Sequence, residues 1–303
     1  MRLFYCRHFS WNFGDELNPW LWEKVLPFQF DLSVNGWIFI GIGSILNWPG
    51  KYPKAVVFGS GFGYRQVPKG FSEHIKKNWK IYCVRGPLSA KKAGLDSKLA
   101  ITDSSILIHR YFTPDTTVQN SQHRISVIPH WITATQEAES LSKYCMELGY
   151  RMVDPRRSVD EVLQDIANSE RIVTESLHGA IVADALRVPW TPLHLVGNHH
   201  TSVFKWRDWC KSMVIPYKPS VLGGHYSPSM LGRRYLPALM DRGSFAFQRR
   251  RILPKDFVHQ LRSVVEKSTG FLSRDDVFEA RSDAIQEKIG EFISDYHSGM
   301  FDN

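Results

Sequence analysis

The sequence predicts an α/β protein with two parallel sheets, one in each half of the chain. Short β-rich runs alternate with amphipathic helical segments over residues 1–115, and the alternation returns after a polar break at residues 113–123. Strands that alternate with helices at this spacing are typical of parallel sheets with crossover helices. Hydrophobic residues make up 43% of the 303 residues and charged residues 22%, a balance that favours a folded core over general disorder.

The first half contains four expected strands and two expected helices. The strands are β-rich runs at residues 3–6, 37–40, 55–58 and 81–84. Residues 16–25 carry apolar side chains at helical spacing. Pro87 fits the first turn of a helix over residues 88–93, because proline lacks the amide hydrogen that a first helical turn leaves unpaired.

The second half repeats this pattern. Its expected strands are residues 124–128, 151–153, 171–174 and 190–195. Helices are expected at 136–148, ended by Gly149, and at 179–186. A further helix begins after Ser158, where Glu161 stands in the capping-box position.

The pattern changes after residue 215. Residues 233–255 are rich in arginine, and residues 275–298 have the apolar spacing of an amphipathic helix that docks on the body of the protein. These features predict an N-terminal Rossmann-like domain at 1–115, a second at 124–215, and a third segment, 216–303, that contains the basic run and the last helix.

The net charge of the chain limits the classes of partner that it is expected to bind. Lys and Arg outnumber Asp and Glu by 38 to 30, a formal charge of +8 that suits phosphate esters, nucleic acid or an acidic membrane face. No nucleic-acid motif accompanies this charge, so nucleic acid is not expected as a partner. No dense cluster of His, Asp and Glu marks a metal site.

Cysteines and hydropathy indicate the compartment. The four cysteines have no zinc-ligand spacing and are expected to be reduced thiols of a cytoplasmic protein. No secretory signal is visible, and no apolar run reaches the ~18 residues that span a bilayer. Any membrane contact is therefore expected to be peripheral.

Candidate site residues follow the strands, because ligands bind beyond the carboxyl ends of strands in open parallel sheets. The runs GIGS at 41–44 and GSGFG at 59–63 let backbone amides approach a phosphate, and tight turns without a ligand explain them equally well. Arg85 ends a strand and suits bidentate binding of a carboxylate or phosphate, or is a surface charge. Asn12 and Asp15 either cap the first helix or bond an acceptor hydroxyl.

Two histidines also follow strands. His178 lies at the start of a helix, where the positive helix end favours anions and an imidazole can donate to a phosphate or shuttle a proton. A simple capping role is the alternative. His130 follows another strand and either serves a ligand or bonds the local backbone, and Trp131 beside it either stacks on a sugar or joins the core.

The order of several motifs resembles the polysaccharide pyruvyl transferase family. These motifs are NFGDELNPWLWEKV, GIGS, GSGFG, VRGPLSA, TDSSIL, IPHW and ESLHGAIVADALRVPW, within residues 3–212. The resemblance implies a GT-B-like fold, in which two Rossmann-like domains with parallel sheets face a central cleft. It also implies that phosphoenolpyruvate donates pyruvate to a sugar of a lipid-linked exopolysaccharide repeat unit. The product is a pyruvate ketal, and no cofactor or metal is expected.

The resemblance also suggests residue roles. Many members carry Arg where this chain has Ser176, so Arg85 is expected to hold the charge of the donor. His178 is expected to act as acid or phosphate ligand, while His130 or Asp15 serves the acceptor hydroxyl. The expected donor-binding residues are Arg85, Ser176, Leu177, Gly179, Gly59, Ser60 and Gly61, and the expected acceptor-binding residues are Asn12, Trp131 and Glu16.

Two other functions fit the same sequence. A sugar-nucleotide-dependent GT-B glycosyltransferase would need an acidic ribose ligand, for which Glu175 is the candidate. A non-catalytic carbohydrate-binding assembly factor is the second, and the departure at Ser176 favours it. The basic run at 233–255 fits an acceptor held at the inner face of the plasma membrane, or is an ordinary solvated surface.

Overall fold

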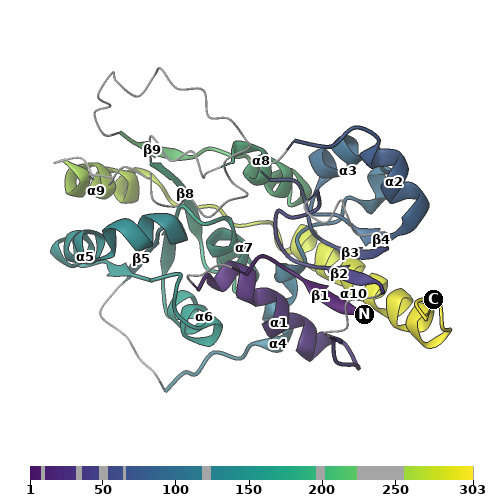
Figure 1. The fold of residues 1–303 in the computed structure, drawn as a ribbon. Helices are drawn as coiled ribbons and strands as arrows, with labels where there is room; N and C mark the ends of the chain where they lie inside the picture. The colour runs from purple at the N-terminus through teal and green to yellow at the C-terminus, as the bar shows by residue number, and fades with distance from the viewer. Residues whose placement is uncertain are drawn as a thin grey trace.

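The computed structural model describes residues 1–7, 11–31, 36–47, 54–63, 66–117, 124–195, 202–223 and 256–302. Two parallel sheets, one from each half of the chain, are surrounded by helices (Figure 1). This arrangement confirms the predicted α/β class. The basic run at 233–255 lies outside the described residues.

The first sheet has its strands in sequential order, all parallel. They are β1 (Arg2–Phe4), β2 (Ile38–Ile40), β3 (Ala55–Phe58) and β4 (Trp79–Cys83). The helical elements of this half are α1 (Phe13–Val25), α2 (Phe71–Asn78), α3 (Pro87–Ala93), η1 (Ser97–Leu99), η2 (Ser104–Leu107) and α4 (Ile108–Tyr111).

The second sheet has the order β6-β5-β7-β8-β9 and is also parallel. Its strands are β5 (Ile125–Ile128), β6 (Arg151–Met152), β7 (Arg171–Thr174), β8 (Trp190–Leu195) and β9 (Ser220–Leu222). Its helices are α5 (Trp131–Glu147), α6 (Val159–Ala167), α7 (Leu177–Ala185), α8 (Val203–Ser212) and α9 (Phe257–Lys267). The chain steps from β5 to opposite sides for β6 and β7, so the topological switch point lies at the ends of β5 and β7.

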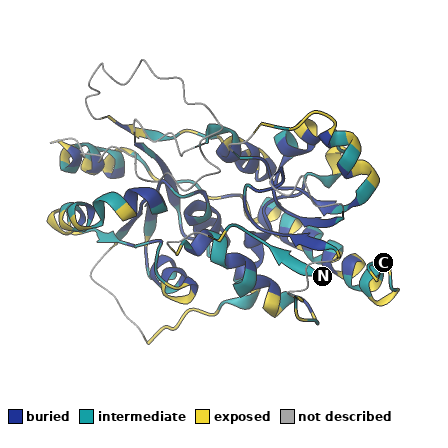
Figure 2. Cartoon of the chain, in the orientation of Figure 1, coloured by how far each residue is buried: buried dark blue, intermediate teal, exposed yellow. Residues whose placement is uncertain are grey.

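One hydrophobic core joins the two sheets. Successive residues of a strand point to opposite faces. Phe39 therefore joins the shared core with Ile128 and Ile172 of the second sheet, while Ile38 and Ile40 pack against the outer helices of the first. Figure 2 shows the buried residues concentrated on the strands and on the inward faces of the helices.

The last helix, α10 (Asp275–His297), returns to the first sheet and contacts β4 (Figure 1). Its Phe292 packs edge-on against Phe58 and Tyr82, with ring centroids 5.4 and 5.5 Å away. The Tyr82 hydroxyl donates to the Asp295 carboxylate at 2.6 Å. This aromatic cluster fixes the C-terminal helix on the N-terminal half.

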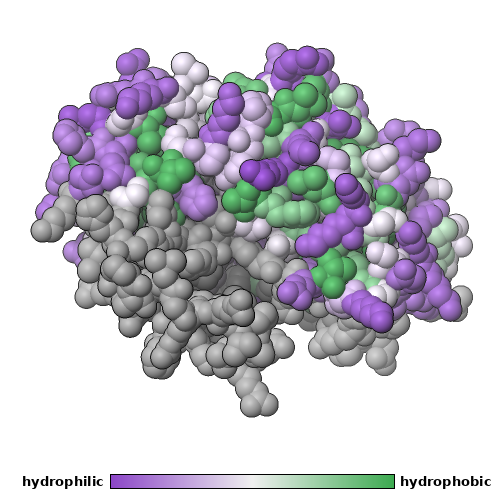
Figure 3. Space-filling view, turned by 90° about the horizontal axis from the view of Figure 1, so that it is seen from above, coloured by the Kyte–Doolittle hydropathy of each residue, from purple (hydrophilic) through white to green (hydrophobic). Residues whose placement is uncertain are grey.

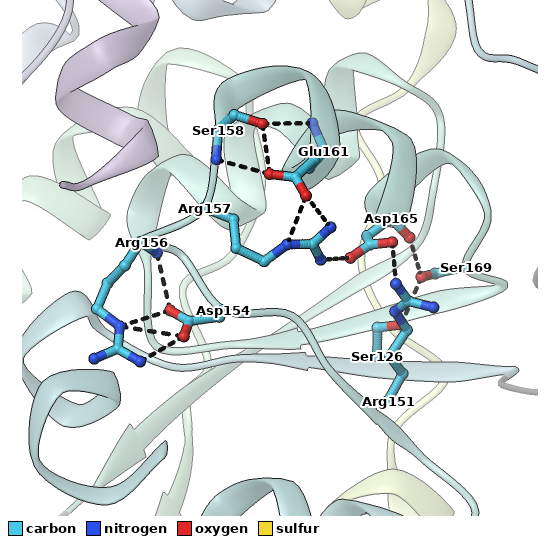
Figure 4. Close-up of polar contacts among 9 residues, drawn as sticks. All are labelled: Ser126, Arg151, Asp154, Arg156, Arg157, Ser158, Glu161, Asp165 and Ser169. Atoms are coloured by element: carbon cyan, nitrogen blue, oxygen red, sulfur yellow. Dashed lines mark hydrogen bonds and ion pairs between the residues drawn. The ribbon is translucent and has the colours of Figure 1, made fainter. Parts of the chain in front are cut away.

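The predicted capping box of α6 is confirmed. The Glu161 amide bonds the Ser158 hydroxyl, and the Glu161 carboxylate accepts from the Ser158 amide at 3.2 Å. Arg157 bridges Glu161 and Asp165, and Asp165 also accepts from Arg151 at 2.5 Å (Figure 4). These ion pairs hold the turn that leads from β6 into α6.

Several elements differ from the sequence prediction. Helix α1 begins at Phe13, three residues before the predicted start, so Asp15 and Glu16 lie in its first turn. Helix α5 begins at Trp131 and is interrupted at Glu137, whose backbone is not helical. Helices α2, α8 and α9 were not predicted, because their runs mix charged with apolar residues, and β9 was not predicted because it has only three residues.

The described helices include none that is long and apolar enough to cross a bilayer. Seen from above, the described surface mixes hydrophilic side chains with small apolar patches (Figure 3).

Replacing Phe292 by Ala should remove the central ring of the α10 contact and lower the free energy of unfolding by about 3–5 kcal/mol. The exposed Glu287→Ala on the same helix is the control and should change it by less than about 0.5 kcal/mol. Urea titration followed by circular dichroism measures both. Equal effects of the two changes would show that α10 is not anchored by this ring.

Candidate active site at the start of α7

His178 lies in the first turn of α7, immediately after β7. Ser176 is the N-cap, and its hydroxyl accepts from the Gly179 amide at 3.4 Å. Gly179 is required because a Cβ there would lie 2.6 Å from the Thr174 hydroxyl oxygen. Leu177 is buried in the core. The predicted block 176–179 thus forms a tight strand-to-helix turn at the switch point.

The start of α1 packs directly against His178. A Cβ on Gly14 would lie 2.3 Å from the His178 Nδ1. The preceding amide, that of Phe13, donates to the carbonyl of Pro155 in the second half at 2.8 Å. The motif NFGDE of the first half and the motif ESLHG of the second therefore meet at the imidazole.

Three buried polar atoms near this imidazole have no hydrogen-bond partner within the described part of the chain. They are His178 Nε2, Asp103 Oδ2 and the Ser104 hydroxyl. Nε2 and Oδ2 are 3.9 Å apart, and the other Asp103 oxygen accepts from the Ser105 amide and hydroxyl. Buried polar groups are rarely left unpaired. An unpaired group of this kind is expected where a ligand or a proton completes the site.

Burial and nearby cations set the protonation of His178 and Asp15. Burial, with the charges of Lys205 and Arg85, lowers the pKa of His178 to about 3. Burial raises the pKa of Asp15 to about 6, against the hydrogen bond from Asn12 and the charge of Lys205. At neutral pH, the imidazole is therefore neutral. The Asp15 carboxyl titrates close to neutrality, as general acids and bases do.

Asn12, Asp15 and Glu16 lie together at the start of α1. The Asn12 backbone carbonyl accepts from the Asp15 and Glu16 amides, and its side-chain amide donates to the Asp15 carboxylate at 2.6 Å. Burial and repulsion from Asp15 raise the pKa of Glu16, while the charge of Arg7 lowers it. Asn12 therefore stands at the N-cap position, and its side chain orients Asp15. A bond from either residue to an acceptor hydroxyl stays a prediction.

His130 caps α5. Its Nδ1 accepts from the Ile132 amide at 3.4 Å, which puts the proton of a neutral ring on Nε2. Its amide donates to the buried Glu175 carboxylate at 3.0 Å, and this bond ties the ends of β5 and β7 together. Trp131 is half-buried beside it. The local-backbone alternative for His130 is thus observed.

Arg85 is completely buried, and internal partners take its guanidinium. It donates to the Asp208 carboxylate at 3.2 Å, to the Ser44 hydroxyl at 2.6 Å and to the Phe62 carbonyl at 2.6 Å. Asp208, from α8, also accepts from the Leu88 and Ser89 amides at 2.9 Å. A carboxylate of the chain itself thus occupies the anion position beside Arg85 and the start of α3.

Gly59, Ser60 and Gly61 are packed in the same way. The Gly59 amide donates to Cys83 and the Gly61 amide to Gly43, both at 3.0 Å. A Cβ on Gly61 would lie 2.6 Å from the Arg85 guanidinium carbon. Gly61 thus makes room for Arg85 and Gly59 for Ser104, so this turn is filled by the chain's own residues. We therefore do not propose that Arg85 or residues 59–61 contact the donor.

The structure thus places the start of α1, with Asp15, against His178, and the charges of Lys205 and Arg85 act on the imidazole. Lys205, Gly14, Asp103 and Asp208 were not among the expected site residues. Asp103 is part of the TDSSIL motif, so its motif position was a usable signal. Among the described residues, no three His, Cys, Asp or Glu side chains gather as a metal site.

The fold and the order of the motifs are those expected of an α/β transferase, with His178 and a carboxyl of raised pKa, Asp15, between two parallel sheets. The family model for polysaccharide pyruvyl transferase matches residues 6–193. The chain is 37% identical over 222 residues to the succinoglycan biosynthesis protein ExoV of Rhizobium meliloti (strain 1021), which covers 72% of this chain and 67% of that protein. No solved structure matches.

The chain therefore belongs to the polysaccharide pyruvyl transferase family. It is an enzyme that transfers pyruvate to an exopolysaccharide.

Replacing Asp208 by Ala should leave the Arg85 guanidinium buried without its counter-charge and lower the free energy of unfolding by about 3–5 kcal/mol. The matched control is Asp283→Ala, which breaks an exposed ion pair with Arg110 and should cost less than about 1 kcal/mol. Urea denaturation measures both. A loss below 1 kcal/mol for Asp208→Ala would contradict the buried pairing.

Proposed function

We propose that this enzyme takes pyruvate from phosphoenolpyruvate and delivers it to a lipid-linked repeat unit at the junction of α1, α7 and α8. One observation carries this proposal. His178, whose pKa is lowered, and Asp15, whose pKa is raised, lie near the same buried cation, Lys205. The N-terminal half (1–115) would supply the acceptor side and the 124–215 region the donor side, in a GT-B-like arrangement.

The reaction requires both proton transfer and charge stabilisation. The donor methylene carbon gains a proton to become a methyl group, and one sugar hydroxyl adds to the neighbouring carbon. A second hydroxyl of the same sugar then displaces phosphate and closes the ketal. Of the two hydroxyl protons, one balances the new methyl group and one leaves on hydrogen phosphate. A site for this chemistry needs cations for the donor and acid–base groups for the protons.

Lys205 and the start of α7 are the proposed donor-binding groups. The Lys205 side chain is buried, and its charge lowers the pKa of both His178 and Asp15. A helix N-terminus adds positive potential and amide donors for an anion. In this proposal Lys205 takes the role that the family's arginine has at position 176. Arg85 does not contact the donor in this proposal. Its charge lowers the pKa of His178, and its partner Asp208 also holds the start of α3.

His178 and Asp15 are the proposed acid–base pair. The charges of a bound donor would raise the pKa of His178, because they oppose the neighbouring cations. An imidazolium formed there faces the unpaired Asp103 oxygen 3.9 Å away. Asp15 would take the proton of the acceptor hydroxyl, with Asn12 holding its carboxylate. Glu16 and Trp131 remain proposed contacts of the acceptor sugar.

A sugar-nucleotide-dependent glycosyltransferase is less well supported. Its ribose ligand was expected to be Glu175. That carboxylate is buried and accepts from the His130 amide, so it holds strand ends together. We also propose a cytoplasmic location, at the inner membrane face where a lipid-linked acceptor is displayed.

The test is incubation with ¹³C-labelled phosphoenolpyruvate and a lipid-linked oligosaccharide, read by mass for an added pyruvate ketal and by released phosphate. The same glycan without its lipid is the comparison that tests the lipid linkage. UDP- and GDP-sugars replace the donor in parallel reactions. Glycosyl transfer from these nucleotides without ketal formation would overturn the proposal.

Replacing His178 by Gln should keep the fold and lower phosphate release in the presence of acceptor by about 10²- to 10⁴-fold, the usual contribution of an acid–base group. The control is His109→Gln, whose ring lies against α10 and away from this centre. Near-normal turnover of the His178 variant would remove it from the mechanism.

The pH dependence of kcat/KM should reflect the titration of the Asp15 carboxyl. As a base it is active when deprotonated, so kcat/KM should rise with pH through about 6, the pKa of this carboxyl. Asp15→Asn should lower kcat/KM and abolish the part of this rise that belongs to the enzyme. A rise that persists in the variant belongs to the donor phosphate, whose second pKa is also about 6. Identical profiles for both proteins would exclude Asp15 as the base.

A further inference from the structure

A groove of about 1050 Å³ runs along the β1 edge of the first sheet. Strand β1 is the edge strand of that sheet, and its residues are half-exposed. The groove lies between β1 with the residues that follow it and the second half of α1 with the turn after it. Its volume exceeds the roughly 300–1,000 Å³ of pockets for single small ligands.

The groove combines aromatic rings with planar polar groups. Tyr5 lines it with the Arg7 guanidinium 5.0 Å from its ring centroid. Glu23 and Gln29 line it as exposed side chains. Rings offer apolar faces, while carboxylates, amides and guanidinium groups can bond hydroxyls on both sides of a sugar. The mixture of charges does not favour a phosphate or an apolar peptide.

One end of the groove approaches the first turns of α1, where Pro19 lines it one turn after Asp15. Arg7 follows β1 at its carboxyl end, and its charge lowers the pKa of Glu16, the neighbour of Asp15. From Asp15, helix α1 leads away along the groove to Glu23, eight residues or about 12 Å further on. A ligand that reacts at Asp15 and also touches Glu23 must therefore be longer than one sugar.

The far end is partly closed by the chain itself. The Asp31 amide donates to the Met1 carbonyl at 2.8 Å, so the turn after α1 covers the start of the β1 edge. This leaves little free edge for an added peptide strand, which needs a row of open backbone groups.

We propose that this groove binds the part of the acceptor glycan next to the pyruvylated sugar, and so selects an oligosaccharide over a single sugar. This inference rests on the proposed function, because it takes the Asp15–His178 centre as the place of transfer. The inference goes beyond the proposed function because it assigns the groove along β1 as an extended subsite for the acceptor glycan.

The experiment measures kcat/KM at saturating phosphoenolpyruvate with di-, tetra- and hexasaccharide fractions of the lipid-free acceptor glycan. The wild-type value should rise with acceptor length. Glu23→Ala should lower it about fivefold for the hexasaccharide, as expected for one lost charge-assisted hydrogen bond, and leave the disaccharide unchanged. Lys24→Ala, the next exposed residue of α1 and not a lining residue, is the matched control and should change neither.

A second pair of variants tests the ring. Tyr5→Ala should lower the hexasaccharide value about tenfold, and Tyr5→Phe should restore most of it by keeping the stacking face. Values of kcat/KM that do not depend on acceptor length, or equal effects of Glu23→Ala and Lys24→Ala, would overturn the proposal that the groove binds the glycan.

Calorimetric titration of the hexasaccharide without donor separates the two proposals. Binding that is weakened by Glu23→Ala supports the groove even if no pyruvate is transferred. Transfer that is indifferent to length and to Glu23 supports the proposed function alone. Absence of both hexasaccharide binding and pyruvate transfer would reject the proposal that the groove binds the glycan.

Discussion

The buried pairing of Asp208 with Arg85 is the interaction on which the two halves of the site depend. One carboxylate from α8 meets the guanidinium at the end of β4 and the first amides of α3, so a helix of the second half is fixed to the first. Three residues before Asp208, on the same helix, Lys205 lies near His178 and Asp15, the proposed acid–base pair. The position of this proposed donor-binding cation is thus set by a buried charge pair.

A second constraint acts from the other side. The amide of Phe13 bonds Pro155, and Gly14 leaves only enough room for the His178 ring. Pro155 belongs to the turn whose ion pairs hold β6 and α6 together (Figure 4). The start of α1, which carries Asp15, is therefore held against His178 by a backbone hydrogen bond to the second half and by the close packing of Gly14.

The sequence was sufficient for much of the fold and for part of the site. Short apolar runs predicted the bounds of β3, β7 and β8, and the switch-point rule selected His178. Buried charges were the main failure. Arg85 and Asp208 are 123 positions apart, and a charged residue in a short amphipathic segment is normally a surface group, so neither their pairing nor helix α8 was visible. The raised pKa of Asp15 also depends on burial that spacing does not reveal.

The return of α10 to the first sheet has a consequence for synthesis on the ribosome. The aromatic face formed by Phe39, Phe58 and Tyr82 belongs to strands made early, yet the ring that covers it, Phe292, follows Tyr82 by 210 positions. Nascent chains thus carry an uncovered apolar face until residue 292 has left the ribosome. The N-terminal sheet should therefore depend on chaperones for longer than its position in the chain suggests, and a ribosome that stalls before α10 should release an aggregation-prone fragment.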